Sequence, residues 1–226
     1  VKKEFLVKKP KNLSTKESMT IGTAGFTALL CALAVNAREE ILLGEKVNDV
    51  LVTGATGGVG TIAVMALSKL GYNVTAVTGK TENTELLKKL GAKNIVNRSE
   101  FEGETKLLGK AIWDGVVDTV GGNILANAIS QTKHSGIVAA CGNAGGIKLN
   151  TNVMPFILRG VKLWGIDSIQ VSMKRRRFVW SQVERLIDFK VLNELVQVIN
   201  MEELMNTFPK MLKGQTSGRI VVDVNK

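Results

Sequence analysis

The 226-residue sequence predicts an α/β protein built on a doubly wound parallel sheet. Short apolar segments rich in β-branched residues alternate with segments of helical period, which is typical of right-handed βαβ units. A glycine-rich turn joins the first of these strands to its helix, as in sheets that bind ligands at the carboxyl ends of their strands. A hydrophobic content of 45% is enough for a sizeable core.

The predicted elements follow in a regular order. Ser14 and Glu17 form a capping box that begins a short helix ending before Gly22, and an apolar helix over residues 25–37 follows. Six strands are expected over residues 49–53, 73–77, 94–97, 115–119, 136–140 and 161–165. Between them, helices are expected over residues 57–70, 82–90, 124–132 and 153–158.

The turn after the first strand carries the strongest functional signal. Gly54, Gly57 and Gly60 follow an apolar strand directly, and Ala55, Gly57 and Gly60 also fit the G-x-G-x-x-G pattern with alanine in its first place. Glycines let the backbone approach a pyrophosphate, and a helix beginning near Gly57 directs free N–H groups and its positive dipole end at the anion. A simple strand–helix turn is the alternative. The apolar helical spacing after the turn favours a Rossmann-type dinucleotide site.

The end of the second strand indicates which dinucleotide binds. An NAD site places Asp or Glu there to accept hydrogen bonds from the ribose. This sequence has Thr78, Gly79, Lys80 and Thr81 instead, and a lysine with two hydroxyls offers donors to a 2′-phosphate. We therefore expect NADPH, with relaxed cofactor choice and an ordinary exposed Lys80 as the alternative.

The charge and cysteine content restrict the remaining classes. The net charge is +10, with its densest cluster at residues 174–177, but no nucleic-acid-binding motif accompanies it. The positive net charge suits anionic ligands. The basic run at residues 174–177 is expected to be a solvated helix face. Cys31, Cys141 and the single His134 cannot form a disulfide framework or a zinc site, which indicates a reducing cytoplasm. The most apolar stretch, residues 24–35, is too short to span a membrane.

Several segments together show a family resemblance. They are Thr20 to Ala28, Val50 to Gly60, Val77 to Lys80, Asp118 to Gly122, Ala140 to Gly142 and Met154 to Val161. As an ordered set they resemble the medium-chain dehydrogenase/reductase superfamily, and within it the zinc-independent quinone oxidoreductase group that includes acryloyl-CoA reductases of the YhdH/YhfP type. The resemblance runs from about Glu4 to the end of the chain.

The resemblance implies a two-domain reductase with a GroES-like catalytic domain and a Rossmann domain. Residues 1–13 would be a remnant of the first domain, residues 14–200 the NADP-binding domain, and residues 201–226 a helix and strand returning to the first domain. Residues 1–9 and 218–224 would be strands that have lost their partners. Most of the catalytic domain is then missing, so no catalytic residue is assigned and the chain alone is expected to be inactive.

The resemblance also implies a cofactor-binding set. Thr56, Gly57, Gly58 and Val59 would meet the pyrophosphate, Thr78, Gly79 and Lys80 the 2′-phosphate, Arg98 the adenosine end, and Asn143, Ile157 and Ser168 the nicotinamide side. Arg98 could equally be a surface arginine.

The expected reaction is reduction by NADPH of an activated C=C bond in a small acyl-CoA such as acryloyl-CoA. The alternatives are a quinone substrate and a non-catalytic NADPH-binding module. A homodimer is expected through the edge strand at residues 161–165, unless the last helices cover that strand. Neither nucleic acid nor a membrane is an expected partner.

Overall fold

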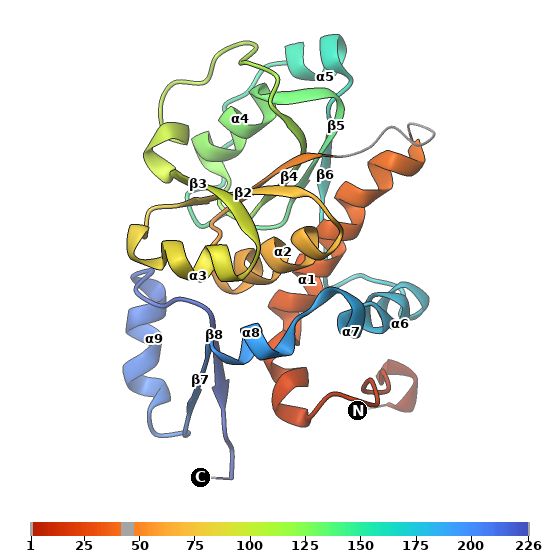
Figure 1. The fold of residues 1–226 in the computed structure, drawn as a ribbon, viewed down its shortest axis with the longest axis vertical. Helices are drawn as coiled ribbons and strands as arrows, with labels where there is room; N and C mark the ends of the chain where they lie inside the picture. The colour runs from red at the N-terminus through yellow and green to blue at the C-terminus, as the bar shows by residue number, and fades with distance from the viewer. Residues whose placement is uncertain (1, 42–47, 226) are drawn as a thin grey trace.

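A six-stranded parallel sheet forms the centre of the protein (Figure 1). The computed structural model describes residues 2–41 and 48–225. The strands are β1 (Asp49–Thr53), β2 (Asn73–Thr78), β3 (Ala92–Asn97), β4 (Trp113–Asp118), β5 (Thr132–Ala140) and β6 (Lys162–Gly165). Their order is β3-β2-β1-β4-β5-β6, so the chain reverses its direction of travel across the sheet between β1 and β4. All six strands were predicted from the sequence, and the doubly wound class is confirmed.

Helices cover both faces of this sheet. The helices of the described residues are α1 (Thr15–Ile41), α2 (Gly58–Lys69), α3 (Thr84–Lys89), α4 (Gly122–Ser130), α5 (Met154–Arg159), α6 (Met173–Ser181), α7 (Val183–Leu186), α8 (Phe189–Asn193) and α9 (Leu204–Leu212), with 3-10 turns η1 (Lys3–Phe5), η2 (Thr81–Asn83) and η3 (Arg98–Phe101). Alternate residues of β1 separate the two cores: Val50 and Val52 pack with α1 and α2, while Leu51 packs with Ile124 and Ile129 of α4. This alternation follows from the period of two in a strand.

The long helix α1 contains both predicted N-terminal helices. The backbone N–H of Ser14 donates to Glu17 Oε2 at 2.7 Å and the N–H of Glu17 donates to Ser14 Oγ at 3.1 Å, which is the predicted capping box. Gly22, at φ 47° and ψ −152°, breaks the helical path inside α1. By length and composition residues 15–38 could cross a membrane, contrary to the sequence expectation. However, 67% of that apolar window is buried inside the protein, as in the core helix of a globular fold.

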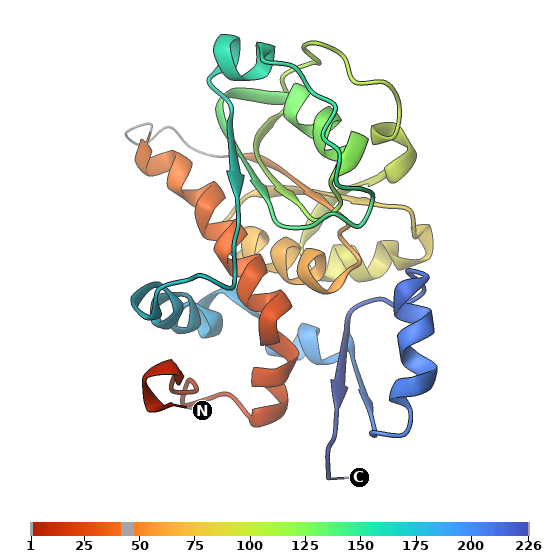
Figure 2. The same ribbon diagram turned by 180° about the vertical axis from the view of Figure 1, so that it is seen from behind.

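A smaller sheet lies beyond the main one, beside α9 (Figures 1 and 2). It pairs β7 (Val196–Ile199) with β8 (Arg219–Val222) in parallel. β8 therefore has a strand partner, contrary to the expectation for residues 218–224. Residues 2–9 contain the 3-10 turn η1 and no strand, so the expected strand over residues 1–9 is also wrong for its described part. The sequence contains no local signal for a pairing between strands separated by α9.

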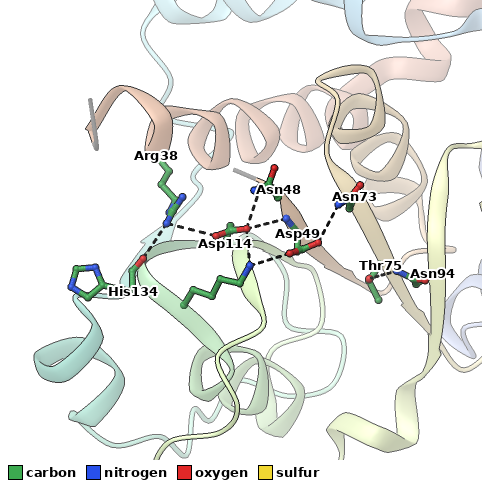
Figure 3. Close-up of polar contacts among 9 residues, drawn as sticks. Arg38, Asn48, Asp49, Asn73, Thr75, Asn94, Asp114 and His134 are labelled. Carbon is green, nitrogen blue, oxygen red and sulfur yellow. Dashed lines mark hydrogen bonds and ion pairs between the residues drawn. The ribbon is translucent and has the colours of Figure 1, made fainter. Parts of the chain in front are cut away.

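A polar cluster fastens the amino ends of the central strands (Figure 3). Asp114 accepts hydrogen bonds from the backbone N–H of Asn48 at 3.1 Å and of Asp49 at 3.0 Å. Lys133 Nζ donates to both carboxylates, at 3.0 Å to Asp49 and 3.1 Å to Asp114. Arg38 of α1 pairs with Asp114 at 3.6 Å. These contacts connect α1, β1, β4 and β5 at the edge opposite the glycine-rich turn.

Candidate functional site

A cleft of about 1030 Å³ opens at the carboxyl ends of the strands, where the strand order reverses. Ligands of doubly wound sheets bind at such a switch point. Its walls come from the turns after β1, β2, β4 and β5 and from the C-terminal segment around Gly214 and Thr216. Of the predicted site residues, the following line it: Thr56, Gly57, Thr78, Gly79, Lys80 and Arg98.

The glycine-rich turn has the geometry of an anion site. Gly54 has φ 60°, which favours glycine, and a Cβ on Gly60 would overlap the carbonyl oxygen of Gly54 and lie 2.7 Å from the Cα of Ala55. The helix α2 therefore starts directly against the turn. The N-cap of α2 is Gly57, which has no side chain to cap the helix. The first-turn N–H groups, which include those of Gly58 and Val59, therefore have no side-chain cap to compete with a phosphate oxygen.

Two cations lie beyond the end of β2. The backbone N–H of Lys80 donates to Thr78 Oγ1 at 3.0 Å, and Thr78 Oγ1 lies 3.2 Å from Thr56 Oγ1, so the turns after β1 and β2 are connected. The guanidinium of Arg98 lies against Gly79, 3.4 Å from the position of a Cβ there. Lys80 and Arg98 thus flank one end of the cleft, as a 2′-phosphate site requires.

Glu102 is a carboxylate that the sequence reasoning did not place at this end. It lines the cleft and forms an ion pair with Arg98, with 2.8 Å between Arg98 Nε and Glu102 Oε1. No carboxylate follows β2 directly, as expected, but η3 brings Glu102 from a later segment to the same end of the cleft. Because the Glu102 carboxylate pairs with Arg98, its negative charge at the cleft is compensated by a cation.

The C-terminal segment closes the same end of the cleft. Lys80 Nζ donates to the carbonyl of Thr216 at 2.6 Å and to Ser217 Oγ at 3.4 Å. The N–H of Gly218 donates to the carbonyl of Thr56 at 3.2 Å. Sequence reasoning missed these residues because they follow the Rossmann strands by about fifty positions or more. The only local signal was the pair of glycines that bracket the segment.

Arg219 is a second missed residue. Its guanidinium lies against the start of α2, with Nη1 2.6 Å from the position of a Cβ on Gly58, and its Nε donates to the carbonyl of Thr20 at 2.7 Å. Burial lowers its pKa. This arginine places a positive charge next to the helix N-terminus, where an anion would bind.

Asp118 stabilises the turns at the middle of the cleft. It is fully buried, accepts a hydrogen bond from Thr53 Oγ1 at 2.6 Å and another from the N–H of Gly121 at 2.8 Å. Burial raises the pKa of its carboxyl, and hydrogen bonds from Thr53, Gly121 and Val120 oppose that shift. Asp118 thus connects the ends of β1 and β4 to the loop that lines the cleft.

The predicted nicotinamide residues are not all brought together. Asn143 lies in a neighbouring groove of about 540 Å³, which also includes Ile166 and Asp167, and Ser168 follows this groove in the chain. Ile157 is 67% exposed on α5. Arg159 of the same helix donates to the carbonyls of Ser130 and Thr132 at the amino end of β5, so the structure places Ile157 at the opposite edge of the sheet. Because α5 directly precedes β6 in the chain, α5 ends at the amino edge of the sheet, where β6 begins. This connectivity explains why Ile157 lies away from the cleft.

The residues present fit a dinucleotide. The cleft combines an uncapped helix N-terminus, close backbone packing at Gly60 and two cations at one end. Within the part of the chain that the structure describes, no group of three or more His, Cys, Asp or Glu side chains is placed to hold a metal ion.

Comparison with known proteins establishes the family. The family model described as "Zinc-binding dehydrogenase" matches residues 58–188. The chain is 44% identical to the acrylyl-CoA reductase AcuI of Ruegeria pomeroyi, over all of this chain and 68% of that protein. It is 42% identical to the "Probable acrylyl-CoA reductase AcuI" of Escherichia coli, with the same coverage. The chain belongs to the zinc-independent AcuI/YhdH/YhfP group of the medium-chain dehydrogenase/reductase superfamily. The predicted family is thereby confirmed.

Other members of this group differ in their described substrate and cofactor. The "Putative quinone oxidoreductase YhfP" of Bacillus subtilis is 43% identical over 97% of this chain and 66% of that protein. Among solved structures, the Salmonella enterica YhdH oxidoreductase in complex with NADP superimposes with a TM-score of 0.93 at 41% identity, over 99% of this chain and 68% of that one. The structure of B. subtilis YhfP with NAD bound superimposes with a TM-score of 0.89 at 42% identity, over 99% of this chain and 68% of that one. The chain thus spans about two thirds of the length of these oxidoreductases.

Proposed function

We propose that this protein is an NADPH-dependent oxidoreductase that reduces the activated C=C bond of a small α,β-unsaturated acyl-CoA such as acryloyl-CoA. The observation that carries the cofactor assignment is the pair of cations, Lys80 and Arg98, where an NAD site has an acidic residue. The AcuI relatives support the substrate class, since they are described as acrylyl-CoA reductases.

The residues of the chain bind and orient the cofactor in this proposal. Thr56, Gly57, Gly58 and Val59 hold the pyrophosphate at the start of α2, and Arg219 adds positive charge beside it. Thr78, Gly79, Lys80 and Arg98 hold the 2′-phosphate, while Asn143 and Ser168 border the nicotinamide side. NADPH supplies the hydride when bound. No proton donor is assigned among these residues.

A quinone is the second candidate substrate, favoured by the description of the B. subtilis relative. The deciding measurement is kcat/KM for acryloyl-CoA and for a benzoquinone, with a protein that contains these residues and spans the full length of the AcuI relatives. We expect a higher value for acryloyl-CoA, whereas an equal or higher value for the quinone would contradict the acyl-CoA proposal. NADPH binding without turnover of either acceptor would leave only a binding module. We expect that last result for residues 1–226 alone.

The ionic-strength dependence of the same assay tests the role of the basic run. Arg176 is not part of a free solvated face, because its guanidinium lies 4.6 Å from the ring centre of Phe26 and donates to the carbonyl of Ser168 at 3.1 Å. Lys174 and Arg177 are exposed. If they attract a polyanionic acyl-CoA, kcat/KM falls between low salt and physiological salt, where the screening length is about 8 Å. An unchanged value would contradict this attraction.

We also propose that the protein forms a homodimer through β6. This strand is the edge of the main sheet, and its residues Leu163 and Trp164 are each 38% exposed. Unpaired strand edges with apolar side chains favour pairing with another chain. The alternative is that helices of the same chain cover this edge, and Arg175 of α6 does lie over the Trp164 ring, with its guanidinium carbon 5.9 Å from the ring centre.

A further inference from the structure

A carboxylate lies at the end of the cleft that the proposed function assigns to the 2′-phosphate of NADPH. Glu102 lines this end together with Gly79, Lys80 and Arg98. Among the described residues that line the cleft, it is the only one with an acidic side chain. Its side chain is 49% exposed, so a cofactor in the cleft can reach the carboxylate.

The two cations at this end have different partners before a cofactor binds. Lys80 Nζ donates to the carbonyl of Thr216 at 2.6 Å, so this partner is neutral. Arg98 instead forms an ion pair with Glu102, with 2.8 Å between Arg98 Nε and Glu102 Oε1. A phosphate that approaches Lys80 displaces a neutral group, whereas a phosphate that approaches Arg98 meets an anion that already holds this cation.

The position of Arg98 lets it contact a phosphate without leaving Glu102. Its guanidinium lies along Gly79, with Cζ and Nε each 3.4 Å and Nη2 3.6 Å from the position of a Cβ on that glycine. The pairing with Glu102 is made on the Nε side. A guanidinium has five N–H donors in a fixed planar fork, so the two Nη atoms can bind a phosphate while Nε stays with the carboxylate. Two anions then share one cation.

The carboxylate acts in opposite directions on the two forms of the dinucleotide. A phosphate monoester carries a charge of about −1.5 to −2 at neutral pH, so the 2′-phosphate of NADPH is repelled by Glu102. NADH has a hydroxyl in place of this phosphate. A hydroxyl donates a hydrogen bond, and an ionised carboxylate accepts hydrogen bonds at both of its oxygens. The same side chain therefore disfavours NADPH and favours NADH.

On the basis of the proposed NADPH site, we propose that Glu102 is a specificity-determining residue that narrows the preference for NADPH over NADH. Its carboxylate competes with the 2′-phosphate for Arg98 and accepts a hydrogen bond from the ribose hydroxyl of NADH. Lys80 and Arg98 make the site selective for the phosphate, and Glu102 limits that selectivity so that both cofactors bind.

The experiment is calorimetric titration of the wild type and two variants with NADPH and with NADH, at neutral pH and low salt. Glu102→Gln removes the charge and keeps an amide oxygen that can accept a hydrogen bond. Because the ion pair with Arg98 is about half exposed, we expect its Kd for NADPH to fall about fivefold while that for NADH stays nearly unchanged. Glu102→Ala also removes the acceptor, so its Kd for NADPH should fall and its Kd for NADH should rise about fivefold.

Glu100→Gln is the matched control, since Glu100 is an exposed carboxylate of the same turn η3 and is not among the described residues that line the cleft. This variant changes the net charge equally and should leave both dissociation constants unchanged. The melting temperature of each variant shows that it is folded.

Three results would overturn the proposal. They are an unchanged Kd for NADPH in Glu102→Gln, an equal change in Glu100→Gln, and a shift of both cofactors in the same direction in Glu102→Ala, which would indicate a merely structural role. Each of these results leaves NADPH binding by the wild type in place. Failure of the wild type to bind either dinucleotide would overturn the proposed function itself, and this proposal with it.

Discussion

Replacement of Lys80 by alanine tests the basis of cofactor choice. The ammonium group lies at the end of the cleft beside Arg98, where the 2′-phosphate distinguishes NADPH from NADH. A Lys80→Ala variant removes this donor while leaving the backbone hydrogen bond from residue 80 to Thr78 Oγ1 in place. The change should therefore affect the phosphate and spare the rest of the dinucleotide.

The contacts that Lys80 makes without cofactor determine how much NADPH binding free energy the Lys80→Ala variant loses. A hydrogen bond to a charged group contributes about 1.5–3 kcal/mol. Lys80 already donates to the carbonyl of Thr216 at 2.6 Å, and part of that interaction is exchanged when a phosphate binds, so we take the lower end. A loss of about 1.5 kcal/mol raises the Kd about tenfold.

The assay is titration with NADPH and NADH by calorimetry. We expect the Kd of NADPH to rise about tenfold or more in Lys80→Ala and that of NADH to stay nearly unchanged. Lys88→Ala is a matched control, since Lys88 is an exposed lysine of α3 that pairs with Glu85 on the same helix, at 2.9 Å. Equal affinities of the wild type for both cofactors, or equal losses in the variant, would refute the reasoning.

Three further predictions concern packing, pH dependence and assembly. Gly60→Ala should abolish dinucleotide binding and lower the melting temperature, because the new methyl overlaps the Gly54 backbone; a variant that binds NADPH normally would contradict this. Lys133→Gln should cost about 1–3 kcal/mol in denaturant unfolding at neutral pH, because a buried carboxylate, that of Asp114, loses a cationic donor. Partial burial raises the pKa of Asp49, but hydrogen bonds from Lys133 and Asn73 outweigh that effect and lower the pKa overall. The part of the stabilisation that comes from the Lys133–Asp49 pair is therefore present above about pH 4 and is lost as the pH falls further. The difference between wild type and variant should therefore shrink in acid, and a constant difference from pH 7 to pH 3 would count against it. Light scattering of the wild type should give a dimer mass that Leu163→Glu reduces to a monomer mass, whereas a monomeric wild type would disprove pairing through β6.

Sequence reasoning found the elements whose signals are local. The capping box at Ser14, the interruption at Gly22 and the turn from Gly54 to Gly60 each depend on residues within one or two helical turns of one another. Alternation of strands and helices then fixed the sheet, since parallel neighbours require crossovers of one hand. The carboxyl edge of β1 and β2 followed directly from that topology.

What the sequence did not reveal depends on contacts between distant segments. Glu102 and Arg219 reach the cleft only through the path of η3 and of the last strand, which no spacing rule predicts. Ile157 was misplaced for a related reason, because its position depends on which edge of the sheet α5 reaches.

The contacts of Arg219 have a consequence for how the protein acquires its cofactor during synthesis. The wall of the cleft at the start of α2 is completed by a residue close to the chain's C-terminal end, which holds the backbone of Thr20 near the beginning. A ribosome releases the chain from its N-terminal end, so the main sheet can form while this arginine is still in the exit tunnel. The nascent sheet therefore lacks the positive charge beside the start of α2 until residue 219 has left the exit tunnel.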